Sequence, residues 1–102
     1  MQKIKGIIFD IAGVLMYQGK VYPGAIETIG TLREKGIVLR FLTNSTLNSR
    51  RSYAEKLSQA GIDIHLEDVI TASYATAVYL SHINPTSCWI MLERALLGRY
   101  AA

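Results

Sequence analysis

Short apolar runs alternate along the chain with longer segments in which apolar residues recur every three or four positions. The runs at 7–9 and 37–42 are bounded by glycine and polar residues, as is typical of buried strands in a parallel sheet. Between them, the helical spacing of Ile26, Ile29 and Leu32 predicts one amphipathic helix. Strand, helix and strand form a βαβ unit, so we expect the two strands to pair in parallel.

The alternation continues in the second half of the chain. A second helix is expected after a cap at Asn48 or Ser49, and a short strand is expected at Val69–Thr71. Ser73 is the predicted N-cap of a third helix, which the Asn84-Pro85 pair ends. These segments extend the first unit by further β and α elements.

A hairpin, a strand and a helix complete the predicted pattern. Val14–Tyr17 and Lys20–Tyr22 flank a glycine-bearing turn, which predicts a hairpin flap directly beyond Asp10. Cys88–Met91 is typical of another strand, and Glu93–Tyr100 of a last helix. The alternation as a whole predicts an α/β fold, a three-layer α/β sandwich with a mostly parallel sheet.

Composition narrows the class of protein. Half of the 102 residues are hydrophobic, so we expect one compact domain over residues 1–102 with a modest core. No apolar run approaches the ~18 residues of a membrane span, and the N-terminal segment lacks the apolar region of a signal peptide. The single cysteine, Cys88, excludes an internal disulfide and favours a cytoplasmic location. The net charge is +3 and the basic residues are scattered, so neither membrane nor nucleic-acid binding is expected.

Polar residues follow the first two predicted strands. Asp10 comes directly after the first strand, and Thr43 and Asn44 come after the second. Open α/β sheets bind their ligands at this carboxyl edge. A carboxylate placed there can attack a phosphoryl group that backbone N–H groups and a hydroxyl hold in line, which forms an aspartyl-phosphate. The alternative for a single Asp at a strand end is a cap or a turn.

Five segments carry a resemblance to a known family: Phe9–Leu15, Phe41–Ser45, Ser49–Arg51, Gly61–Ile64 and Val69–Ala75. The sequence resembles the haloacid dehalogenase superfamily of hydrolases. Within it, the resemblance is to phosphatases that insert a large α/β cap, including the phospholysine phosphohistidine inorganic pyrophosphate phosphatase type. It implies a Rossmann-like α/β/α core of which this chain carries the N-terminal half, without the cap and the later motifs.

The resemblance also implies residue roles. Asp10 would be the nucleophile and a Mg²⁺ ligand, and the backbone carbonyl of Ala12 would be a second Mg²⁺ ligand. The phosphate-binding residues would be Ile11, Ala12, Gly13, Thr43 and Asn44. The reaction would be hydrolysis of phosphate esters or pyrophosphate through an aspartyl-phosphate, so the partner would be a small phosphorylated molecule or phosphate.

Two departures from the family pattern argue against full activity. The family usually places a second Asp two residues after the nucleophile as general acid and base, but Ala12 cannot transfer a proton. For the later lysine and acidic motifs the chain offers only Lys56, in a predicted helix, and the pair Glu67-Asp68, for which we expect a solvated capping or loop role. We therefore expect a truncated hydrolase with very weak or absent activity. The alternative is a non-catalytic phosphate-binding or protein-interaction module.

The missing later strands have a consequence for assembly. Without them the first strand is expected to be a sheet edge with exposed apolar faces, which favours pairing with another chain. The expected partner is a second copy of this chain or the missing C-terminal half.

Several other residues have a default interpretation. Arg50-Arg51 opens the second predicted helix and is expected to be a solvated basic face that could also attract an anionic substrate. Cys88 and Trp89 are expected to pack in the core. For Tyr17 and Tyr22 on the predicted flap, packing and substrate contact both stay open.

Overall fold

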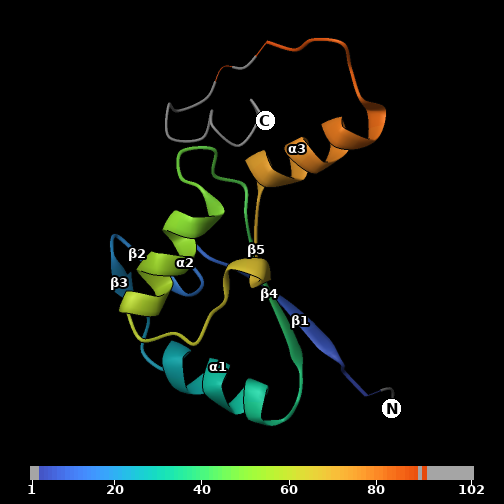
Figure 1. The fold of residues 1–102 in the computed structure, drawn as a ribbon. Coiled ribbons are helices and arrows are strands. Elements are labelled where there is room, and N and C mark those ends of the chain that lie inside the picture. Colours follow the sequence, from blue (N-terminus) through green and yellow to red (C-terminus); the bar gives the residue numbers. More distant parts are fainter. Residues whose placement is uncertain (1–2, 90, 92–102) are drawn as a thin grey trace.

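The computed structural model of the chain describes residues 3–89 and 91 (Figure 1). Its elements are β1 (Gly6–Asp10), β2 (Met16–Tyr17), β3 (Lys20–Val21), α1 (Ala25–Glu34), β4 (Val38–Thr43), α2 (Arg50–Gln59), the short 3₁₀ helix η1 (Leu66–Asp68), β5 (Val69–Thr71) and α3 (Ala72–Ile83). The predicted alternation of strands and helices is therefore confirmed from β1 to α3.

The main sheet has three strands in the order β1-β4-β5. Both strand pairs are parallel, with Phe9 opposite Phe41 and Thr43 opposite Thr71. Two parallel pairs, each joined through a helix, confirm the predicted α/β class with a mostly parallel sheet. In the described part of the chain, β1 is an outer strand that pairs with β4 alone.

The core lies on one face of this sheet. Leu39, Phe41 and Val69 point to that face and are fully or almost fully buried. Ile29 of α1 and Leu57 of α2 pack into the same cluster, so both helices cover this face, as Figure 1 also shows. This single packed layer of two helices fixes the strands whose ends carry the predicted site.

The opposite face of the sheet carries exposed apolar side chains. Ile8 is 67% exposed, Val38 53% and Leu42 45%. Side chains alternate between the two faces of a strand, so the three share one face although they come from two strands. The exposure of Ile8 differs from the buried strand that the 7–9 run is typical of, but it agrees with the exposed apolar face expected for an edge strand, because α1 and α2 cover only the other face.

The helix caps agree with the sequence prediction in part. Ser49 caps α2, because its Oγ accepts the N–H of Ser52 at 3.1 Å. Asn84 ends α3 in the left-handed conformation. The predicted N-cap at Ser73 is wrong: Thr71 caps α3 and its Oγ1 accepts the N–H of Tyr74 at 3.0 Å. The reason is that β5 runs directly into α3, so the last extended residue, Thr71, lies two positions before the predicted cap.

Other predictions about the C-terminal part are corrected. Cys88, Trp89 and Met91 lie outside any strand, and Trp89 is 92% exposed, so neither the strand nor the core role holds at these positions. No strand of the described residues pairs with them, and an apolar run without a pairing partner does not form a sheet strand. The predicted helix Glu93–Tyr100 lies outside the described residues. Among the helices that the structure describes, none is long and apolar enough to cross a membrane.

The buried Ser73 hydroxyl leads to a stability prediction. Ser73 is 4% exposed, and among the described residues its Oγ has no hydrogen-bond partner. Because an unpaired buried polar group is unfavourable, we expect Ser73→Ala to raise the free energy of unfolding by about 1 kcal/mol more than Ser81→Ala does. Ser81 is the matched control, since it lies exposed in the same helix. Urea denaturation measures both variants, and a loss of stability in Ser73→Ala would contradict this account.

Candidate functional site

The carboxyl ends of β1 and β4 bring the two predicted site segments to one edge of the sheet. Asp10, the last residue of β1, is the register partner of Leu42, so Thr43 follows one position further along β4. Asn44 comes directly after the strand. The structure thus confirms that Asp10 and Thr43 end adjacent parallel strands.

Asp10 is exposed at this edge, and its carboxylate has a defined orientation. Oδ1 accepts the N–H of Ile11 at 2.9 Å. This bond restrains the rotation of the carboxylate and leaves the lone pairs of Oδ2 for an incoming group. An exposed, oriented carboxylate at a strand end has the geometry that a nucleophile requires.

The loop after Asp10 is a tight turn built on Ile11. Ile11 is 1% exposed, and its carbonyl oxygen accepts the N–H of Leu15 at 2.9 Å. Gly13 has φ +81°, a left-handed conformation that glycine adopts without a steric penalty, and its N–H donates to the Met16 carbonyl at 2.9 Å. Two of the three N–H groups proposed for phosphate, those of Ile11 and Gly13, therefore already have protein acceptors. Among the described residues, the N–H of Ala12 has none.

Thr43 offers a hydroxyl at the same edge. It is 4% exposed, and its Oγ1 accepts the N–H of Ser45 at 3.2 Å. A hydroxyl that accepts one hydrogen bond keeps its own hydrogen for donation, so Thr43 can still donate to a phosphoryl oxygen. Asn44 beside it is exposed.

The predicted hairpin flap is present as β2 and β3, which pair antiparallel. Gln18 (φ 50°) and Gly19 (φ 79°) form its turn, and two positive φ values are typical of the tight hairpin turn. Tyr17 on the flap is 59% exposed and free to contact a ligand. Tyr22 lines a hollow of about 230 Å³ between the flap and α1, together with Phe9.

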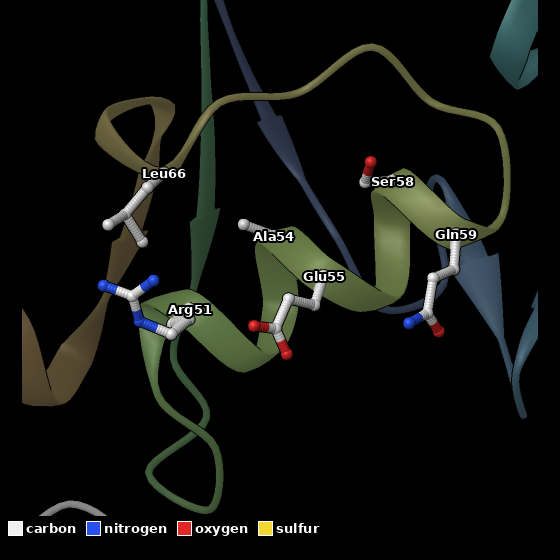
Figure 2. Close-up of a pocket in the computed structure, with 6 residues that line it drawn as sticks. All are labelled: Arg51, Ala54, Glu55, Ser58, Gln59 and Leu66. Carbon is white, nitrogen blue, oxygen red and sulfur yellow. The ribbon is translucent and has the colours of Figure 1, made fainter.

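The two arginines at the start of α2 lie in different environments. Arg50 is not a solvated group: its Nε donates to the Val69 carbonyl at 2.9 Å and its Nη2 to the Leu66 carbonyl at 3.2 Å. Its Cζ lies 3.7 Å from the centre of the Tyr74 ring. Arg51 is exposed and lines a hollow of about 350 Å³ on the outer surface of α2 (Figure 2). The sequence carried one signal for the contacts of Arg50, because a cation in the first turn of a helix needs compensating partners.

Asp68 also differs from its prediction. It caps η1, since its Oδ2 accepts the N–H of His65 at 3.2 Å, but its side chain is 8% exposed and not solvated. Arg33 Nη2 lies 2.8 Å from Oδ2, and Arg40 Nη1 lies 3.3 Å from Oδ1. Both carboxylate oxygens therefore have cationic partners, which leaves Asp68 a structural residue and no metal ligand.

The donor set for Mg²⁺ is incomplete. Mg²⁺ takes about six oxygen ligands in octahedral geometry. Asp10 and the Ala12 carbonyl offer two, and no group of three His, Cys, Asp or Glu residues gathers anywhere in residues 3–89 and 91. The described residues alone do not form a magnesium site.

Known proteins resemble this chain in sequence and in fold. The model of the haloacid dehalogenase-like hydrolase family matches residues 7–100. Phosphoglycolate phosphatase 1A of Arabidopsis thaliana is 36% identical over 84 residues, which are 82% of this chain and 23% of that protein. The phospholysine phosphohistidine inorganic pyrophosphate phosphatase of Danio rerio is 33% identical, over 83% of this chain and 34% of that protein.

A solved structure supports the fold. NagD from the Escherichia coli K-12 strain superposes with a TM-score of 0.88 and 31% identity, covering 98% of this chain and 40% of that chain. This chain therefore spans well under half the length of the three relatives named here.

Proposed function

Because this chain belongs to the haloacid dehalogenase-like hydrolase family, we propose that it is the nucleophile-bearing part of a phosphatase that acts on small phosphorylated molecules. The observation that carries the proposal is the position of Asp10 and Thr43 at the ends of adjacent parallel strands. The named relatives, two of which are phosphatases by name, support the same class of reaction.

The proposed chemistry begins at the Asp10 carboxylate. Its Oδ2 attacks phosphorus and forms a new O–P bond, while the bond from phosphorus to the leaving oxygen breaks. The Thr43 hydroxyl and Asn44 hold phosphoryl oxygens during this step. Water then hydrolyses the aspartyl-phosphate, which releases phosphate and restores the carboxylate.

Proton transfer to the leaving group is the step that this site supports least. The leaving oxygen needs a proton, and Ala12 occupies the position from which the family usually supplies it. Without general acid help the rate falls by about 10²–10⁴. Mg²⁺ belongs to the proposal as the cofactor of the complete phosphatase, with Asp10 and the Ala12 carbonyl as its contacts on this chain.

Ala12 also favours a second candidate function, a non-catalytic module that binds phosphate or another protein. The two functions share the phosphate-binding edge and differ in turnover. The interaction module needs the sheet edge at which Asp10 and Thr43 end their strands, and it needs no proton donor, so Ala12 is compatible with it.

Hydrolysis and binding assays separate the candidates. We expect the chain with Mg²⁺ to hydrolyse p-nitrophenyl phosphate and pyrophosphate at the background rate, because Ala12 cannot donate a proton and residues 3–89 and 91 gather no further carboxylates for the metal. We expect it to bind inorganic phosphate in calorimetry, and Thr43→Val, which removes the hydroxyl at nearly constant shape, to weaken that binding about tenfold.

Two results would change the assignment. Magnesium-dependent hydrolysis that disappears in Asp10→Asn would show a complete site and overturn the expected inactivity. Absence of both hydrolysis and phosphate binding would leave the protein-interaction module.

The proposal includes an assembly. The open edge of β1 and the exposed side chains of Ile8, Val38 and Leu42 are the surface at which another chain would complete the sheet. A second copy of this chain or a C-terminal half would fill that place.

A further inference from the structure

Arg50 joins three elements through one side chain. It is the first residue of α2, and its guanidinium donates to the carbonyls of Val69 in β5 and Leu66 in η1, at 2.9 and 3.2 Å. The same guanidinium stacks on Tyr74 in the first turn of α3. A planar guanidinium makes two directed hydrogen bonds and presents a flat face, a combination that an ammonium group cannot reproduce.

The segment 44–49 lies directly before Arg50 and begins with the proposed phosphate-binding residue Asn44. Its own hydrogen bonds are short-range: the N–H of Ser45 donates to Thr43 Oγ1 at 3.2 Å, the N–H of Leu47 donates to Ser45 Oγ at 3.3 Å, and Ser49 Oγ accepts the N–H of Ser52 at 3.1 Å. Leu47 is 64% exposed. A segment with little packing takes its path mainly from its two ends. One end is Thr43 in β4 and the other is Arg50.

Both ends are held by the same neighbouring strand. Thr43 is the register partner of Thr71 in β5, and Arg50 binds the carbonyl of Val69 in β5. Val69 and Thr71 are two residues apart, about 7 Å along the strand. Arg50 therefore attaches the far end of segment 44–49 to the strand that already fixes its near end.

We propose that Arg50 is a positioning residue for phosphate binding, which holds segment 44–49 so that the Thr43 hydroxyl and Asn44 meet the same phosphoryl group. The inference rests on the proposed phosphate-binding function. Arg50 acts through the segment and not by contact with the anion, because its guanidinium is engaged with two carbonyls and a ring. Arg51, which lies on the outer surface of α2 in Figure 2, provides a neighbouring cation without these partners.

The test uses the full chain with two readouts. Calorimetry measures the dissociation constant of inorganic phosphate, and hydrogen exchange measures the amides of residues 44–47. We expect Arg50→Lys to raise the dissociation constant about tenfold, the scale of one lost charge-assisted hydrogen bond, and to speed exchange in the segment by a similar factor. Tyr74→Leu, which removes the stacked ring without changing charge, should act in the same direction.

Matched controls separate positioning from charge and from general stability. Arg51→Ala removes a neighbouring charge, and Ile29→Val loosens the buried core slightly; both should leave the phosphate dissociation constant within about twofold. Wild-type affinity in Arg50→Lys would show that charge alone suffices and would overturn the proposal. Unchanged exchange of residues 44–47 in both Arg50→Lys and Tyr74→Leu would also overturn it. If the wild-type chain binds no phosphate, the proposed function fails, and the exchange readout alone decides the role of Arg50.

Discussion

Replacing Asp68 by alanine is expected to lower the free energy of unfolding by about 3 kcal/mol. The carboxylate is 8% exposed and lies 2.8 Å from Arg33 and 3.3 Å from Arg40. Its removal leaves two guanidinium groups without their partner, and the Arg33 side chain is itself only 21% exposed. It also frees the N–H of His65 at the start of η1. Urea denaturation followed by circular dichroism measures the change.

Asp63 provides the matched control for this prediction. Its carboxylate lies 3.6 Å from Arg33 Nε but is 65% exposed, so solvent screens the pair. We expect Asp63→Ala to cost less than about 0.5 kcal/mol, since the Asp63 backbone carbonyl keeps its bond from Arg33. Equal effects of the two substitutions would contradict the role assigned to burial.

The chain is expected to associate at micromolar concentration through the open edge of β1, and Ile8→Lys is expected to reduce the association to a monomer. The N–H of Val38 donates to the Lys5 carbonyl at 3.0 Å. Backbone groups alternate in direction along a strand, so the N–H and C=O groups of the odd-numbered residues of β1 point toward β4. The N–H of Ile8 therefore points to the open side, and its side chain is 67% exposed. A charged residue at an edge opposes strand pairing. Sedimentation velocity measures the size of both species.

Leu47→Lys is the control, because Leu47 is 64% exposed and lies in the loop after β4, outside the strand pair β1-β4. It should leave the association unchanged. A wild-type monomer with slow amide exchange at Ile8 would show that the edge is covered within the chain, and would contradict this account of the assembly.

Much of the fold follows from short-range features of the sequence. The apolar runs near residues 7–9 and 37–42 specified β1 and β4, because a strand that packs on helices needs consecutive apolar residues over a short length. The polar residues directly after them, Asp10 and Thr43, specified the site edge, because parallel strands end on the same side. The hairpin followed from the Gln18-Gly19 turn.

Other features depend on which elements meet in space. The sequence predicts solvated roles for Arg50 and Asp68. In the structure Arg50 binds the carbonyl of Val69, 19 residues away, and Asp68 binds Arg33, 35 residues away. Hydrophobic period and capping chemistry determine local structure, whereas the pairing of charges is decided by the register of β5 against β4 and by the end of α1. Trp89 is exposed because no described strand pairs with its run. The sequence by itself thus determined the strands and α-helices from β1 to α3 and the place of Asp10 and Thr43. The tertiary structure decided which side chains hold these elements together, because such contacts join residues whose separation along the chain carries no periodic signal.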